Sequence, residues 1–164
     1  MRKHYAILVA SVLVLAGSGC GGSKSSRNTP MTRGCTSLTV EDVARVASRT
    51  PRKVDLNPSP TEQIRCSTVF FAGPSELIVA VTEQDGGAKA LRRLRATKVA
   101  QRGAASVRPA PSFGEGAFTA QGRLIIFRRG ERVVTLETGY ATSGKKVLTL
   151  AQLQRLAHIV EPRL

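Results

Sequence analysis

Residues 123–139, RLIIFRRGERVVTLETG, place the strongest constraint on the fold of this chain. Two apolar runs rich in Ile, Val and Leu lie on either side of Gly130. This pattern is typical of two strands joined by a tight turn, a β-hairpin. The chain is therefore expected to contain an antiparallel sheet.

Two further strands are expected upstream. Apolar runs at 66–72 and 76–84 are separated by Gly73 and Pro74, which favour a turn, so these runs predict a second hairpin. The glycine-rich segment 113–118, FGEGAF, leads into one more strand.

Three segments have the pattern of helices. Apolar residues recur at helical spacing in 38–48, 85–100 and 149–160, and the middle segment carries basic residues on its other side. Both outer segments open with the spacing of a capping box, in which a Thr side chain and an acid or amide three residues later satisfy the first backbone N–H groups. These pairs are Thr39 with Asp42 and Thr149 with Gln152.

The order of elements predicts the fold class. Residues 51–63 and 101–112 are expected to be loops, which leaves a helix, two strands, a helix, two or three strands and a helix. This order indicates an α+β fold, an antiparallel sheet with helices packed mainly on one face. The 130 residues from Cys35 to Leu164 suffice for one domain and scarcely for two.

The N-terminal residues have the pattern of a secretory signal peptide. Arg2 and Lys3 give a positive start, and eleven apolar residues follow from Ala6 to Ala16. At about 1.5 Å per residue this run is too short to cross a hydrocarbon layer of roughly 30 Å. A leader that is removed on export is expected, and a buried N-terminal helix is the alternative.

Gly17, Ser18, Gly19 and Cys20 follow that apolar run, and the cysteine resembles the lipidated residue of the bacterial lipoprotein lipobox. Gly17 departs from that motif, which usually has an aliphatic residue three positions before the cysteine. The resemblance implies cleavage before Cys20, lipidation of its thiol and anchoring to the extracytoplasmic face of the cell membrane. Ordinary secretion is the alternative. The implied organisation is a leader at 1–19, a flexible Gly- and Ser-rich tether at 20–34 and a folded domain at 35–164.

Two cysteines remain once Cys20 is assigned to the lipid. An even number in an exported domain predicts a disulfide between Cys35 and Cys66, and two unpaired buried thiols are the alternative. No metal site is expected, because two cysteines and His158, the one histidine beyond the leader, do not make a four-ligand zinc set.

The whole pattern resembles small actinobacterial lipoproteins of uncharacterised function. The resemblance rests on the lipobox cysteine, the short tether, CTSLTVEDVARVA, a second cysteine opening a strand, FGEGAF, LIIFRRGERVVTLE and the terminal LAQLQRLAHIV. It covers 35–164 and implies placement and fold. It brings no catalytic residues with it.

The charge of the chain points to acidic partners. Lys and Arg number 25 against 11 Asp and Glu, a net charge of +14, of which +12 remains without Arg2 and Lys3. An anionic envelope glycan, a lipid headgroup or an acidic partner protein would suit such a surface. Nucleic acid is not expected, given the implied compartment and the absence of Trp. A generic basic surface, set by genome composition, is the competing interpretation.

The candidate anion-binding residues form three groups: Arg92, Arg93, Arg95 and Lys98; Arg128, Arg129 and Arg132; and Lys145 with Lys146.

Signals for catalysis are weak. His158 has no candidate nucleophile nearby and is expected to decorate the last helix. Glu115 could act with a second acid such as Glu76 or Asp85, which makes a small carboxylate-dependent envelope hydrolase the alternative function. FGEGAF lacks the flanking strand, helix and third glycine of a dinucleotide-binding motif.

The preferred function is a lipid-anchored binding or accessory module with no catalytic residue and no cofactor. A domain that only supports a membrane complex is a third possibility, and it predicts an exposed apolar patch.

Overall fold

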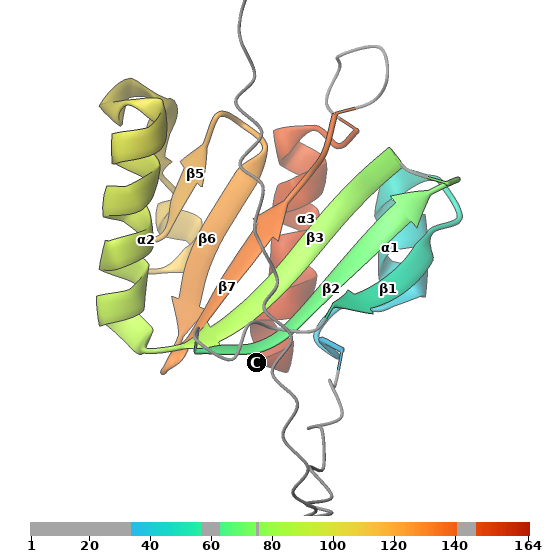
Figure 1. Cartoon of the computed structure of the whole chain (residues 1–164), viewed down its shortest axis with the longest axis horizontal. Coiled ribbons are helices and arrows are strands. Elements are labelled where there is room, and N and C mark those ends of the chain that lie inside the picture. The colour runs from blue at the N-terminus through green and yellow to red at the C-terminus, as the bar shows by residue number, and fades with distance from the viewer. Residues whose placement is uncertain (1–33, 57–62, 75, 141–146) are drawn as a thin grey trace, which may run out of the picture. The chain divides into compact units, whose positions relative to one another are not determined.

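The structure is a computed structural model that describes residues 34–56, 63–74, 76–140 and 147–164. These residues form one antiparallel sheet and three α-helices in a single α+β domain (Figure 1), which confirms the predicted fold class. The helices are α1 (Val40–Ala47), α2 (Gly87–Arg102) and α3 (Leu150–Val160), and the strands are β1 (Arg52–Leu56), β2 (Ile64–Ala72), β3 (Glu76–Asp85), β4 (Val107–Pro109), β5 (Phe118–Ala120), β6 (Leu124–Arg129) and β7 (Arg132–Glu137). Short 3-10 turns follow α2, β4 and α3, at Ala104–Ser106, Pro111–Phe113 and Glu161–Arg163.

Some predictions fall on residues outside those ranges. The leader, Cys20 and the tether up to residue 33 lie there, and so do Lys145 and Lys146. None of the helices described is long and apolar enough to span a membrane.

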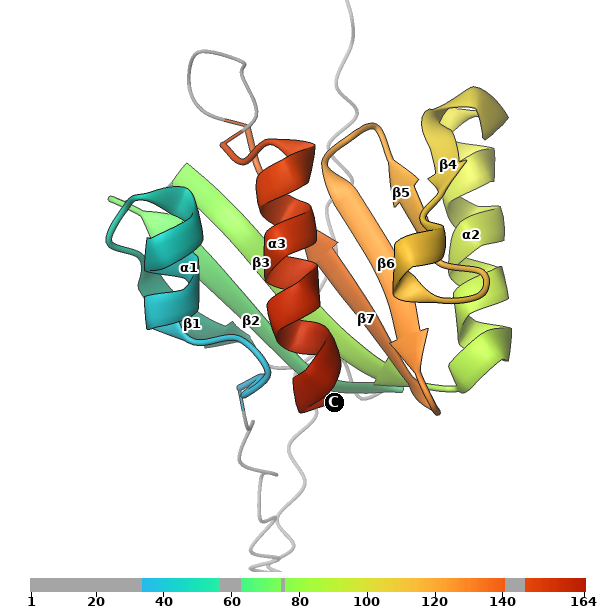
Figure 2. The same ribbon diagram turned by 180° about the vertical axis from the view of Figure 1, so that it is seen from behind.

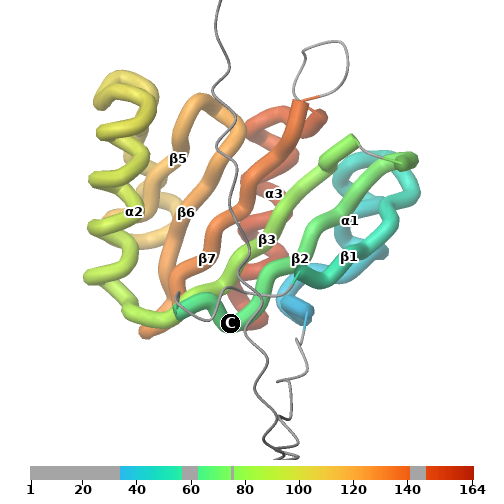
Figure 3. Tube along the Cα trace, viewed as in Figure 1, coloured from blue at the N-terminus to red at the C-terminus, as the bar shows by residue number. Residues whose placement is uncertain are grey.

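The sheet has the strand order β1-β2-β3-β7-β6-β5-β4. Both predicted hairpins are confirmed, since β2 pairs with β3 and β6 pairs with β7. Gly130 in the second turn has a φ of 56°, a conformation that glycine adopts without strain. β3 and β7, which are far apart in the sequence, lie side by side and join the two halves of the sheet (Figure 3).

Two predicted loops contain edge strands. β1 lies within 51–63 and β4 within 101–112, so both segments were wrongly predicted to lack strands. An edge strand pairs on one side only and buries little, so the alternation of apolar residues is weak in its sequence. In β1 only Val54, opposite Val69, is partly buried. β4 is three residues long and ends in Pro109, a residue that sheets accept mainly at their edges.

The helices cover both faces of the sheet. Successive residues of a strand point to opposite faces, and in β6 Ile125 and Phe127 pack in a cluster with α1 and α3, whereas Leu124 and Ile126 pack with α2. α1 and α3 therefore lie on one face, here called the α3 face, and α2 lies on the other, the α2 face (Figures 1 and 2).

Both predicted capping boxes are present. The Thr39 side chain accepts from the Asp42 N–H, and the Thr149 side chain accepts from the Gln152 N–H, while each N3 side chain accepts in return from the N-cap backbone. Gln152 also donates to the Val46 carbonyl at 3.0 Å, which ties α3 to α1. The local sequence signal therefore also fixes how the two helices meet.

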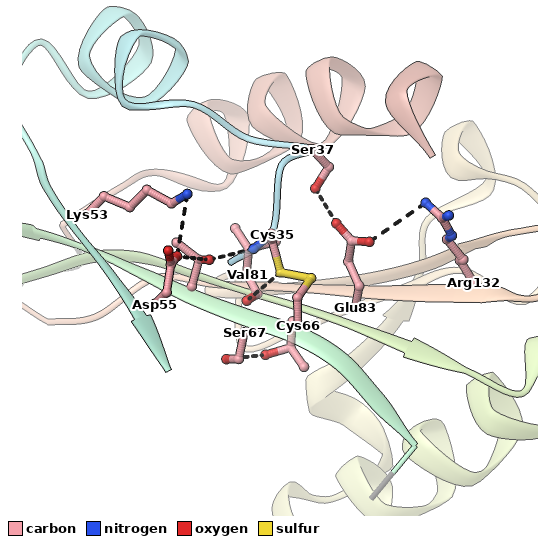
Figure 4. Close-up of a disulfide and its surroundings, with 11 residues drawn as sticks. Cys35, Ser37, Lys53, Asp55, Cys66, Ser67, Val81, Glu83 and Arg132 are labelled. Atoms are coloured by element: carbon pink, nitrogen blue, oxygen red, sulfur yellow. Dashed lines mark hydrogen bonds and ion pairs between the residues drawn. A yellow bond between two sulfur atoms is a disulfide. The ribbon is translucent and has the colours of Figure 1, made fainter. Parts of the chain in front are cut away.

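The predicted disulfide is confirmed. Cys35 and Cys66 are bonded, 31 positions apart in sequence, and they are 1% and 7% exposed. Figure 4 shows the bond beneath the segment that leads into α1. The Cys35 N–H donates to Thr68 Oγ1 at 2.8 Å, and that hydroxyl donates to Asp55 at 2.7 Å. The bond and these contacts hold the start of the domain against β2.

The C-terminal turn is tied to α1 by an ion pair. Arg163 Nη2 lies 3.3 Å from Asp42 Oδ1, and Arg163 Nη1 donates to the Ser37 carbonyl at 3.3 Å. Asp42 is only 3% exposed. The hydrogen bond from Arg163 lowers the pKa of Asp42; burial opposes this shift, and hydrogen bonds from Thr39 add to it. The ionised form of Asp42 therefore favours the folded state.

Asp42→Asn is expected to lower stability at neutral pH and to remove part of its pH dependence. The folded-state pKa lies below the ordinary value of about 3.9, so the stabilisation is complete above that value and is lost as the pH falls through the lowered pKa. The urea midpoint of Asp42→Asn should lie below that of the native chain at pH 7 and converge on it in acid. Glu115→Gln, at an exposed carboxylate, is the control. A gap between the native chain and Asp42→Asn that stays constant into acid would contradict this role.

Candidate functional site

Helix α2 carries the largest predicted basic cluster. It begins after Gly86, whose φ is 111°, and the Gly87 N–H donates to the Glu131 carbonyl at 3.0 Å, which fixes the helix start to the β6–β7 turn. Ala90 and Leu91 are buried against the α2 face of the sheet. The apolar stripe thus faces the sheet, and the basic residues are left along the flanks and the outer side of the helix.

One flank of α2 borders a pocket of about 360 Å³, here called the α2–β6 pocket. Arg92 and Arg95 of α2 line it together with Arg128 of β6. The other lining residues are Ala88, Leu91, Glu115 and Gly116. Residues from two of the basic groups named from the sequence therefore line one pocket, which three arginines share with one glutamate.

A glycine turn forms the remaining side of this pocket. Glu115 stands between Gly114 and Gly116, which have φ values of 92° and 77°. A Cβ on Gly116 would lie 3.2 Å from Leu91 Cδ2, so the turn approaches α2 closely. The approach of the turn to α2 explains how Glu115, distant in sequence, comes to line the same pocket as the arginines.

The hairpin cluster is split between the two faces of the sheet. Arg128 lies on the α2 face, whereas Arg129 and Arg132 pair across the turn on the α3 face. Arg129 Nη1 lies 3.6 Å from the Glu161 carboxylate, and Arg132 Nη1 lies 4.0 Å from that of Glu83. The three arginines grouped from the sequence therefore do not share one face of the sheet, because alternation along the strands separates Arg128 from Arg129 and Arg132.

The α2 cluster is divided as well. Lys98 is not among the described residues that line the α2–β6 pocket or the hollow on the other flank of α2. Arg93 lines a second hollow on the other flank of the helix, with Lys89, Gln63 and Gln84. Lys89, Gln63 and Gln84 were not among the candidates predicted from the sequence. Lys89 and Arg93 are four positions apart in the sequence, a spacing that places two side chains on the same side of a helix. This spacing could have predicted from the sequence that the two cations lie together.

The disulfide lies beside a buried acid. Ser37 Oγ donates to Glu83 Oε1 at 2.5 Å, and Glu83 is 5% exposed (Figure 4). Cys35, Cys66 and Glu83 bring their possible ligand atoms within 4.8 Å of one another. Because both sulfurs are bonded to each other, they offer no thiolate, and this cluster is not a metal site in the oxidised protein.

The acids considered for catalysis, Glu115, Glu76 and Asp85, do not line one common pocket. Glu76 lies 2.8 Å from Arg49, and Asp85 lies 3.1 Å from Arg65, each in its own ion pair. Among the described residues that line the α2–β6 pocket, Glu115 is the one acid. The geometry therefore gives the hydrolase alternative no pair of carboxylates.

His158 lies on the exposed side of α3. Its ring centroid is 4.4 Å from that of Phe113, and its Nδ1 is 4.0 Å from the Glu161 carboxylate. This placement agrees with the expected role at the helix end. No serine or cysteine nucleophile is among these contacts.

The chain was also compared with known proteins. No family model, no curated protein and no solved structure matches it.

Proposed function

We propose that the chain is a membrane-anchored extracytoplasmic lipoprotein whose domain serves as a binding or accessory module for an anionic envelope component or an acidic partner protein. The observation that carries the binding role is the convergence of Arg92, Arg95 and Arg128 on the α2–β6 pocket. These side chains come from two elements that the sequence alone does not place together.

The chemistry of the pocket suits an anion. Guanidinium groups present planar sets of donors that match carboxylate and phosphate oxygens. Glu115 balances one of the three positive charges, which leaves the pocket with an excess of two. A pocket of about 360 Å³ has room for an acidic group such as a phosphate or a carboxylate.

The placement rests on the leader, Cys20 and the tether. Two acyl chains hold a protein stably at a membrane, because each buried methylene contributes about 0.8 kcal/mol. The disulfide supports an oxidising compartment. The resemblance to small actinobacterial lipoproteins supports the same location. The mass of the N-terminal peptide tests the anchor, and unmodified Cys20 still preceded by leader residues would overturn it.

Arg92→Glu combined with Arg95→Glu is expected to weaken binding at least about tenfold without lowering the melting temperature, because both side chains are exposed and charge reversal repels an anion. Binding to isolated envelope glycans and to phosphatidylglycerol vesicles is measured across a salt series. The protein used is the oxidised, non-lipidated chain 21–164. All seven described strands, both apolar clusters and the disulfide lie within it, so it retains the contacts that build the domain.

Arg45→Glu combined with Arg155→Glu is the matched control. These exposed residues lie on α1 and α3, and the variant has the same net charge as the α2 variant. If both variants lose affinity equally at every salt concentration, the attraction is a property of the whole surface and the proposed pocket is wrong.

A further inference from the structure

The second hollow beside α2 is larger than the first. It has a volume of about 690 Å³ and lies between α2 and the end of β3, and we call it the α2–β3 pocket. The described residues that line it are Gln63, Gln84, Gly86, Lys89, Ala90, Arg93 and Leu94. It shares no described lining residue with the α2–β6 pocket, so a ligand bound in it can be tested separately.

Two cations stand on one wall of the α2–β3 pocket. Lys89 and Arg93 are both exposed and are one helical turn apart. Like charges at this spacing repel each other and weaken a helix. Neither has an ion-pair partner within the described part of the chain, and no acid is among the described lining residues. A bound anion would relieve this repulsion.

Two carboxamides stand on the other wall. The Asp85 N–H donates to the Gln63 carbonyl at 2.9 Å, which fastens the chain before β2 to the end of β3 and brings Gln63 near Gln84. Gln84 Nε2 is buried and has no hydrogen-bond partner within the described residues. Buried donors in folded proteins are nearly always paired with an acceptor. We therefore expect a ligand oxygen to accept a hydrogen bond from Gln84 Nε2.

The approach of Gln63 to the helix start is close. A Cβ on Gly86 would lie 3.2 Å from Gln63 Oε1 and 3.1 Å from the Ala90 Cβ. Gly86 therefore allows the amide to stand at the edge of the pocket, where it can act as donor and acceptor. Ala90 and Leu94 add a small apolar surface between the amides and the cations.

We propose that the α2–β3 pocket binds a phosphorylated polyol, such as a sugar phosphate or a glycerol phosphate headgroup. Arg93 and Lys89 bind the phosphate, the first through paired N–H groups and the second as a point charge. Gln63 and Gln84 bind hydroxyl groups, since carboxamides both donate and accept. The volume exceeds what a bare phosphate fills, which leaves room for the polyol. The anionic envelope component of the proposed function is one source of such a ligand, but this inference depends on different residues.

The test measures binding of glucose 6-phosphate, glucose and inorganic phosphate to the oxidised chain 21–164 by calorimetry. Vesicles of phosphatidylglycerol and of phosphatidic acid form a second arm, because the first headgroup carries a polyol and the second does not. Glucose 6-phosphate should bind at least about tenfold more tightly than glucose or phosphate, or phosphatidylglycerol more tightly than phosphatidic acid. The first result identifies a free or glycan-borne sugar phosphate as the source, and the second a lipid headgroup.

Lys89→Gln combined with Arg93→Gln should weaken this binding about tenfold or more, whereas Arg45→Gln with Arg155→Gln should change it less than about twofold. Arg45 and Arg155 are exposed on α1 and α3 and are not among the described residues that line either pocket. Gln84→Leu should also weaken binding while stability in urea stays the same or rises, because it removes a buried donor without a partner. A merely structural glutamine would give a loss of stability instead.

Three results would overturn the inference. One is the absence of preferential binding in both arms. Another is binding that Lys89→Gln with Arg93→Gln leaves unchanged. The third is an equal loss in the Arg45→Gln, Arg155→Gln control. The Arg92→Glu, Arg95→Glu experiment on the α2–β6 pocket has its own outcome, so failure of one proposal is distinguishable from failure of the other.

Discussion

Replacing Cys35 and Cys66 together by alanine is expected to lower the free energy of unfolding by about 3–4 kcal/mol. The two residues are 31 positions apart, and the bond removes the entropy of that loop from the unfolded chain. Urea unfolding measures the loss. The dependence of unfolding free energy on urea should also become steeper, because the unfolded chain without the cross-link exposes more surface.

The native chain unfolded with its disulfide reduced is the control for this experiment. It lacks the cross-link but keeps both sulfur atoms in the core, so it separates the effect of the loop from that of packing. Both proteins should be destabilised by similar amounts. A loss below about 1 kcal/mol in the double variant would show that the cross-link contributes little to this fold.

Thr138→Val is expected to cost about 2–4 kcal/mol of unfolding free energy, because it leaves two buried backbone groups without partners. Thr138 is fully buried. Its Oγ1 donates to the Ile78 carbonyl at 2.7 Å and accepts from the Leu148 N–H at 3.1 Å. Ile78 lies at an irregularity of β3, where Phe70 pairs with Val79 but the next residue of β2 pairs with Leu77. The threonine hydroxyl therefore satisfies a carbonyl next to this bulge and also holds the segment that leads into α3.

Thr135→Val is the matched control, since Thr135 lies three positions earlier, within β7, is only half-buried and makes no side-chain hydrogen bond to another described residue. Its effect should stay within about 0.5 kcal/mol. Equal stabilities of the two valine variants in urea would contradict the role of the Thr138 hydroxyl.

The elements that the sequence predicted well depend on local chemistry. The capping boxes at Thr39 and Thr149 need only residues within one turn, and the glycine at 130 needs only its two flanking strands. β1 and β4 were missed because each pairs with a single neighbour and buries few side chains. Their presence depends on β2 and β5, which are distant in the chain or separated by a turn.

The candidate sites were only partly predictable for the same reason. Arg128 could have been separated from Arg129 and Arg132 by the period of two along the strands. Arg128 and Arg92 line one pocket, and Gln84 and Arg93 line the other. Both pairings depend on where α2 lies on the sheet. No local pattern contains that information, because it depends on how the apolar stripe of α2 packs on β6 and β7.

The two outer strands also bear on how the protein behaves at high concentration. An open sheet edge can recruit a strand of another molecule, which begins aggregation. β1 carries Arg52, Lys53 and Asp55 on one edge, and β4 is short and ends in Pro109 on the other. Charge, shortness and proline are the features that discourage such strand addition. The sheet is therefore protected at both ends against growth from one molecule to the next, a property that matters most for proteins crowded together on a surface.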